Sequence, residues 1–175
     1  LIMSKPDWFK YELIWDKNKC GSPGLAKFRP MKMHENILVF APGKTIYNPQ
    51  METGEPYYRQ GSKKIRCNNH GYGFNTDNEI ENTGTRYPKS IIGISRDFSA
   101  QQQVHPTQKP VPLLEWLIST YTHRGDVVLD NVMGSGSTGV AALNLDRRFI
   151  GIERDEKYME IAKERIEAAA GEDLV

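Results

Sequence analysis

The sequence predicts an α/β fold in which helices pack on a mainly parallel sheet. Three observations carry this prediction. From Pro110 onward, short apolar segments alternate with amphipathic helical segments, which is typical of a parallel sheet with helices on its faces. One of these apolar segments ends in a glycine-rich loop that opens a helix. The composition, 38% hydrophobic and 26% charged over 175 residues, is that of one ordinary globular domain.

The first half of the chain is expected to hold few regular elements. Two short strands are predicted at residues 11–15 and 36–40, joined as a hairpin by a loop rich in Lys, Gly and Pro. Residues 41–104 are rich in Gly, Asn, Pro, Tyr, Lys and Arg, with a single clear strand at 90–95. This region is therefore interpreted as an irregular insertion.

The second half follows a regular order of helix, strand, helix, strand and helix. The strands are predicted at 127–130 and 149–153, with a helix at 137–145 between them. Apolar spacings of three and four predict the buried faces of the two flanking helices. These faces consist of Leu113, Leu114, Leu117, Ile118 and Tyr121 in the first helix, and Tyr158, Ile161, Ala162, the stem of Arg165, Ile166 and Ala169 in the last.

Charge is distributed unevenly along the chain. Residues 1–109 contain 16 Lys and Arg against 10 Asp and Glu, whereas residues 110–175 contain 7 against 12. The basic part is the expected partner of a polyanion. No apolar run is long enough to span a membrane and no signal-peptide pattern is present, so we expect a cytoplasmic protein without a membrane partner. Cys20, Cys67 and the four histidines are scattered, and no metal site is predicted.

The glycine-rich loop has the pattern of a nucleotide-cofactor site. Gly134, Gly136 and Gly139 form G-x-G-x-x-G after a strand, and acidic Glu153 ends the next strand. Such glycines let the backbone bend and a cofactor approach, while the acid can accept hydrogen bonds from ribose hydroxyls. NAD, S-adenosylmethionine and a purely structural turn all satisfy this pattern. Asp130 favours S-adenosylmethionine, because a carboxylate suits its cationic sulfonium and ammonium groups better than a pyrophosphate.

Two motifs identify the family that the chain resembles. HPTQKP at 105–110 and DNVMGSGSTG at 130–139, within residues 105–166, resemble the permuted (β-class) amino-methyltransferases of DNA, which modify adenine N6 or cytosine N4. KYELIWDKN, PMKMHENILVFAP, YNPQM and TRYPKSII resemble further segments of this family, so nearly the whole chain is covered. The resemblance implies a Rossmann-like S-adenosylmethionine-dependent methyltransferase sheet with a target-recognition insertion.

The resemblance also implies how the chain is divided and which residues bind the cofactor. Residues 1–43 would be a strand hairpin of the catalytic half, 44–104 the DNA-recognition insertion and 105–175 the cofactor half. The segment 105–110 would close over the methionine end of the cofactor, although Pro110 could equally be a helix-start proline. The implied cofactor-binding residues are His105, Thr107, Gln108, Lys109, Pro110, Asp130, Met133, Gly134, Ser135, Gly136, Ser137, Thr138 and Glu153. Among them, the hydroxyls of Ser135, Ser137 and Thr138 are candidate donors to the methionine carboxylate.

Two departures from the family pattern affect the expected site. Asn131 and Val132 stand where the family usually has Pro and an aromatic residue, so the floor of the pocket is expected to differ. The family's catalytic motif, an Asp, Asn or Ser followed by Pro-Pro and an aromatic residue, is missing. It would bind the amine of a base flipped out of the duplex. The sequence EPYY at 55–58 has one proline and follows no strand.

The catalytic motif is therefore expected upstream of Leu1, with three sheet strands. Two of these strands would lie between residues 127–130 and the hairpin. Without them the sheet would have a gap with unpaired edges. We accordingly interpret the chain as a fragment that is inactive on its own and for which independent folding is doubtful.

The insertion holds the candidate contacts to double-stranded DNA, although a solvated polar loop is the alternative for each residue. The candidates are Lys63, Lys64, Arg66, Arg86 and Lys89, with tyrosines 57, 58, 72 and 87 between them. The implied reaction is methyl transfer from S-adenosylmethionine to an exocyclic base amine, most often adenine N6, as in bacterial or phage restriction-modification. Cytosine N4, an inactive cofactor- or DNA-binding remnant, and an enzyme acting on RNA or a small molecule remain alternatives. The target sequence and the oligomeric state are left open.

Overall fold

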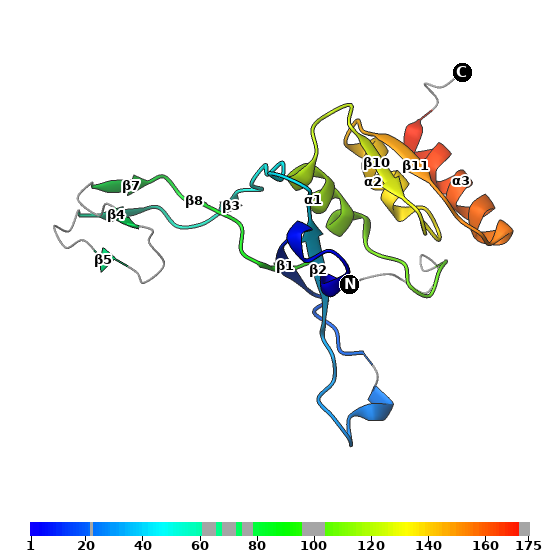
Figure 1. The fold of residues 1–175 in the computed structure, drawn as a ribbon, viewed down its shortest axis with the longest axis horizontal. Helices are drawn as coiled ribbons and strands as arrows, with labels where there is room; N and C mark the ends of the chain where they lie inside the picture. The colour runs from blue at the N-terminus through cyan, green and yellow to red at the C-terminus, as the bar shows by residue number, and fades with distance from the viewer. Residues whose placement is uncertain (22, 61–65, 68–72, 75–78, 96–103, 172–175) are drawn as a thin grey trace. The chain divides into compact units, whose positions relative to one another are not determined.

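A computed structural model describes residues 1–21, 23–60, 66–67, 73–74, 79–95 and 104–171. The chain separates into two compact units (Figure 1). The larger unit combines Leu1–Asn48 with Lys89–Val175, and the smaller one is Pro49–Pro88. Among the described residues, no helix has the length and apolar character needed to cross a membrane.

The predicted hairpin is confirmed and forms two strands of a three-stranded sheet, with β1 in the centre. Strand β1 (Phe9–Asp16) pairs antiparallel with β2 (His34–Phe40), and β9 (Ile91–Gly93) adds to the other side of β1 in parallel. Alternation along β1 buries Leu13 and Trp15 and leaves Glu12 exposed, as expected for a half-buried strand. Three short 3-10 helices, Ile2–Ser4, Pro6–Trp8 and Pro23–Leu25, lie before β1 and in the hairpin loop.

Helix α1 (Val111–Tyr121) contributes to both hydrophobic cores of the larger unit. Its Leu113 packs with Leu13, Trp15 and Ile92 of the three-stranded sheet. Its Ile118 packs with two alanines of the next helix. The side chain of Thr120, which is fully buried, donates a hydrogen bond to the Trp116 carbonyl 2.7 Å away, so its burial leaves no hydroxyl unpaired.

Residues 111–170 have the predicted alternating order. Strands β10 (Val127–Asp130) and β11 (Arg148–Gly151) pair in parallel, connected by α2 (Ser137–Asn144). Helix α3 (Glu156–Ala170) follows and lies against α2 (Figure 1). The predicted strand at 149–153 ends earlier, at Gly151, so Glu153 lies in the turn before α3.

The two sheets of the larger unit share no hydrogen-bonded strand within the described residues. This agrees with the predicted gap in an incomplete methyltransferase sheet. In β10 and β11, exposed residues alternate with partly buried ones, and the exposed apolar side chains are Val127, Leu129 and Ile150.

The smaller unit is more regular than the sequence analysis expected. Three short antiparallel ladders pair β3 (Glu52–Thr53) with β8 (Thr85–Arg86), β4 (Tyr57–Arg59) with β7 (Ile80–Asn82), and β5 (Arg66–Cys67) with β6 (Gly73–Phe74). The prediction of a single strand in residues 41–104 was therefore wrong. Segments of two or three residues are too short to show an alternating pattern. The unit lies inside the predicted insertion, whose boundaries at 44 and 104 stay a prediction.

Candidate functional site

The glycine loop between β10 and α2 needs backbone conformations that other residues rarely adopt. Gly134 has φ of 53° and Gly136, the residue before α2, has φ of 75°. A side chain at Gly136 would also contact α3, because an added Cβ would lie 2.9 Å from the Cβ of Ala162. The loop is thus tightly bent and packed against α3, as a cofactor cradle requires.

Asp130 accepts hydrogen bonds from both ends of the glycine loop. Its Oδ1 accepts a hydrogen bond from the Val132 amide at 3.1 Å, and its Oδ2 accepts one from the Thr138 hydroxyl at 2.6 Å. The carboxylate therefore joins the end of β10 to the first turn of α2. In the structure both Asp130 and Thr138 shape the loop.

Glu153, which lies in the turn between β11 and α3, binds the glycine loop. Its Oε2 accepts a hydrogen bond from the Gly134 amide at 2.8 Å, and its Oε1 accepts from the amides of Arg154 and Asp155. These donors, Asp155 foremost, together with nearby His105, lower the pKa of Glu153 from its ordinary value. Glu153 therefore presents an ionised carboxylate at the end of β11, beside the loop.

Arg165 of α3 forms hydrogen bonds with the glycine loop and the first residue of α2. Its guanidinium donates to the carbonyl of Ser135 and to the hydroxyl oxygen of Ser137, 3.3 Å away. Partial burial lowers the pKa of Arg165 from its ordinary value. Sequence analysis assigned only the stem of Arg165 to the buried face and missed this role. The sequence did contain a signal for this role, because Arg165 is a cationic residue at a position that the apolar spacing of α3 places on its buried face.

The segment 105–108 meets the glycine loop, so the two motifs predicted to act together do lie together. The ring of His105 packs over Gly134 and edge-on against Tyr158 of α3, with the ring centroids 4.2 Å apart. Buried Gln108 accepts a hydrogen bond from the Val104 amide at 3.1 Å, and its Oε1 lies 3.4 Å from the Ser135 hydroxyl.

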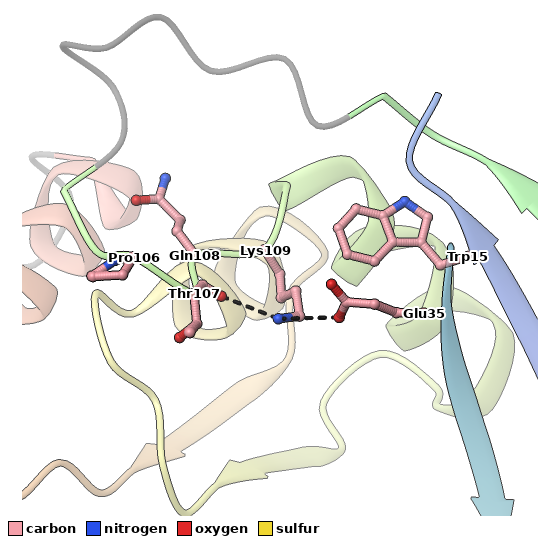
Figure 2. A pocket seen from close by; sticks show the side chains of 6 residues that line it. All are labelled: Trp15, Glu35, Pro106, Thr107, Gln108 and Lys109. Carbon is pink, nitrogen blue, oxygen red and sulfur yellow. Dashed lines mark hydrogen bonds and ion pairs between the residues drawn. The ribbon is translucent and has the colours of Figure 1, made fainter. Parts of the chain in front are cut away.

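Lys109 points to the hairpin. Its Nζ donates to the Thr107 carbonyl at 3.1 Å and lies 3.5 Å from Oε2 of Glu35, as Figure 2 shows. Lys17 binds the other carboxylate oxygen of Glu35 at 3.4 Å. Desolvation raises the pKa of Glu35, but the two ammonium groups outweigh it and the net shift is downward. A cavity of about 100 Å³ lies here, lined by Trp15, Glu35, Pro106, Thr107, Gln108 and Lys109.

The DNA-contact candidates are only partly described. Lys63 and Lys64 lie outside the described residues, Arg66 belongs to β5, and Lys89 is exposed. Arg86 is engaged within the smaller unit: its guanidinium donates to the Asn82 side chain and the Glu55 carbonyl, and lies 4.7 Å from the centre of the Tyr57 ring. Within the part of the chain that the structure describes, no three His, Cys, Asp or Glu side chains gather as a metal site.

The fold and this loop define a class of protein. A parallel strand pair, a glycine loop that opens a helix, and an acid after the second strand characterise a Rossmann-like cofactor-binding α/β fold. The sequence profile of a DNA methylase family, N6_N4_Mtase, matches residues 2–164. The chain belongs to this family of amino-methyltransferases, which confirms the resemblance found in the sequence at the level of the amino-methyltransferases.

Curated relatives are type II methyltransferases. M2.DpnII of Streptococcus pneumoniae is 40% identical over 111 residues, which are 63% of this chain and 40% of that protein. M2.MboI of Moraxella bovis is 38% identical over 94 residues, or 53% of this chain and 34% of that protein. The chain thus matches less than half of the length of either relative.

Solved methyltransferase structures share the fold. The M1.HpyAVI–SAM complex is 29% identical, covers 90% of this chain and 62% of its own, and gives a TM-score of 0.59. The cytosine-N4-specific PvuII DNA methyltransferase covers 94% of this chain and 53% of its own, with a TM-score of 0.62. Its 18% identity supports likeness of fold alone. The methyltransferase fold class predicted from the sequence is therefore confirmed.

Proposed function

We propose that this chain is the cofactor-binding and DNA-recognising part of a permuted DNA amino-methyltransferase. The reaction would transfer a methyl group from S-adenosylmethionine to an exocyclic base amine, most often adenine N6, in double-stranded DNA. The observation that carries the proposal is the meeting of the segment 105–108 with the glycine loop. The S-adenosylmethionine complex of M1.HpyAVI, a relative of similar fold, supports the choice of cofactor.

The residues around the loop fit this cofactor. Glu153 offers an ionised carboxylate to ribose hydroxyls, and Asp130 adds negative charge near a cationic sulfonium. Positive φ at Gly134 and Gly136 shapes the cradle. The cofactor would supply an electrophilic methyl group. The proposed cofactor-binding residues remain those of the sequence analysis, with Thr138 acting through its bond to Asp130 and Ser135 through its contact with Gln108.

The protein's part in catalysis would be mainly positioning. An amine conjugated with a base ring is a weak nucleophile. Holding this amine in line with the methyl group would therefore contribute most to the acceleration of methyl transfer. The exposed tyrosines of the smaller unit, Tyr58 and Tyr87, and the exposed Lys89 support DNA as the partner. Cytosine N4 is the alternative target. The expected location of the protein is the cytoplasm.

A Gly134→Asp variant tests the assignment of the loop. Aspartate would place a side chain at a positive φ and 3.5 Å from the His105 ring, and its charge would oppose Glu153. We expect loss of S-adenosylmethionine binding by isothermal titration calorimetry. The matched control is Gly43→Asp, where an added Cβ meets nothing within 4 Å.

A second variant tests the same site in case Gly134→Asp does not fold. Glu153→Gln keeps the size of the side chain and removes its charge, and we expect the affinity for S-adenosylmethionine to fall about tenfold. Unchanged affinity in both variants, with normal thermal unfolding, would show that the cofactor binds elsewhere.

A further inference from the structure

We infer that Glu35 is a positioning residue: it ties the segment 105–109 to the β1–β2 hairpin and thereby holds this segment across the glycine loop. The inference rests on the proposed function, because its consequence is read as affinity for S-adenosylmethionine. The cofactor-binding residues expected from the sequence do not include Glu35. Its role arises from contacts between distant parts of the chain.

The carboxylate of Glu35 bridges two ammonium groups. Glu35 lies near the start of β2, paired in register with Trp15 of β1. Its Oε1 binds Lys17, which follows β1, and its Oε2 binds Lys109 of the segment. A single side chain therefore joins both strands of the hairpin to a segment that is remote in sequence.

Further contacts connect Lys109 and its neighbours to the glycine loop. Lys109 also donates to the Thr107 carbonyl, which fixes the backbone of the segment. The next contact is made by buried Gln108, whose Oε1 lies 3.4 Å from the hydroxyl of Ser135. Figure 2 shows Lys109 between Thr107 and Glu35, with Trp15 on the hairpin side. The contacts run without interruption from the hairpin to the residues proposed to hold the cofactor.

The position of Glu35 separates this role from a purely structural one. The hairpin is packed through Leu13 and Trp15, which are buried against Leu113 of α1. Glu35 itself keeps 38% of its side chain exposed. Removing its charge should therefore leave the core intact and weaken only the contacts of Glu35 with Lys17 and Lys109.

Two roles for Lys109 predict opposite effects of neutralising Glu35 on the affinity for S-adenosylmethionine. If Lys109 contacts the cofactor carboxylate directly, neutralising Glu35 frees this ammonium and strengthens binding. If Lys109 acts through the tie to Glu35, neutralising Glu35 weakens binding. The sign of the change in affinity therefore decides between them.

The experiment compares Glu35→Gln and Glu35→Asp with the wild-type chain. The matched control is Glu12→Gln on the same hairpin, where the carboxylate is exposed and accepts a hydrogen bond from Asn36 at 3.1 Å. Amide hydrogen exchange of residues 104–109 is measured without ligand, and the affinity for S-adenosylmethionine by calorimetry. We expect faster exchange and about fivefold weaker binding for Glu35→Gln, the size of a modest ion-pair network. Partial recovery is expected for Glu35→Asp, and no change for Glu12→Gln.

Each contrary result has a distinct meaning. Unchanged exchange in Glu35→Gln overturns the tie, whether or not the cofactor binds. Faster exchange with unchanged or tighter binding overturns the positioning role. A wild-type chain that does not bind S-adenosylmethionine contradicts the proposed function, and the exchange measurement still decides whether Glu35 holds the segment.

Discussion

At the scale of single residues, three side chains organise the glycine loop by accepting or donating several hydrogen bonds each. Asp130 joins the two ends of the loop, Glu153 binds the Gly134 amide, and Arg165 supports Ser135 and Ser137. The sequence pattern located Asp130 and Glu153, because acids after parallel strands are part of a known motif. It did not reveal Arg165 or Glu35, whose partners are distant in sequence and become neighbours only in the fold.

The lowered pKa of Glu153 predicts a pH dependence of stability. A carboxyl group whose pKa is lower in the folded chain stabilises the fold above its unfolded pKa, and this contribution is lost as pH falls through the folded pKa. Wild type should therefore be more stable than Glu153→Gln near pH 7, and the difference should shrink as pH falls below about 4.3. Urea unfolding of both proteins across this range measures it. A difference that grew on acidification would contradict the assigned hydrogen bonds.

At the scale of elements, the long and periodic segments could be predicted and the short ones could not. Helices α1, α2 and α3 and strands β10 and β11 follow apolar patterns that extend over one or more turns or a full strand. The ladders of the smaller unit have two or three residues per strand, and their pairing depends on contacts such as Gly54 N to Gly84 O at 2.8 Å. Pairing between distant residues leaves no local pattern in the sequence.

The packing of α2 on α3 makes Gly136 more sensitive than a glycine with the same backbone conformation elsewhere. Gly136→Ala meets both a positive φ and Ala162, whereas Gly125→Ala meets only a positive φ, 81°, in open space. We expect Gly125→Ala to cost about 1–2 kcal/mol and Gly136→Ala about 1–3 kcal/mol more. Chemical denaturation of both variants provides the comparison. Equal losses would show that α3 does not restrict the loop.

At the scale of the whole chain, the described residues form a parallel strand pair with its helices, a hairpin sheet and a smaller unit of short ladders. No strand pairing joins the two sheets of the larger unit in the part of the chain that the structure describes, and the chain covers 62% of M1.HpyAVI. The predicted fold class agrees with this arrangement.

Residues 1–175 alone should not methylate DNA. The sequence contains no Pro-Pro-aromatic motif to bind a flipped base amine, and a base pocket is needed for this chemistry. Incubation with duplex DNA and S-adenosylmethionine carrying a labelled methyl group provides the measurement. Transfer of label to DNA above the level of a Gly134→Asp control would contradict the prediction.

We propose that the glycine loop and the segment 105–110 together form a site for S-adenosylmethionine. Calorimetric titration of the chain with S-adenosylmethionine, and separately with NAD, tests it most directly, because the loop pattern by itself fits either cofactor. The account predicts saturable binding of S-adenosylmethionine, weakened in Gly134→Asp, and no comparable binding of NAD. Tighter binding of NAD, or no binding of S-adenosylmethionine by the folded chain, would contradict it.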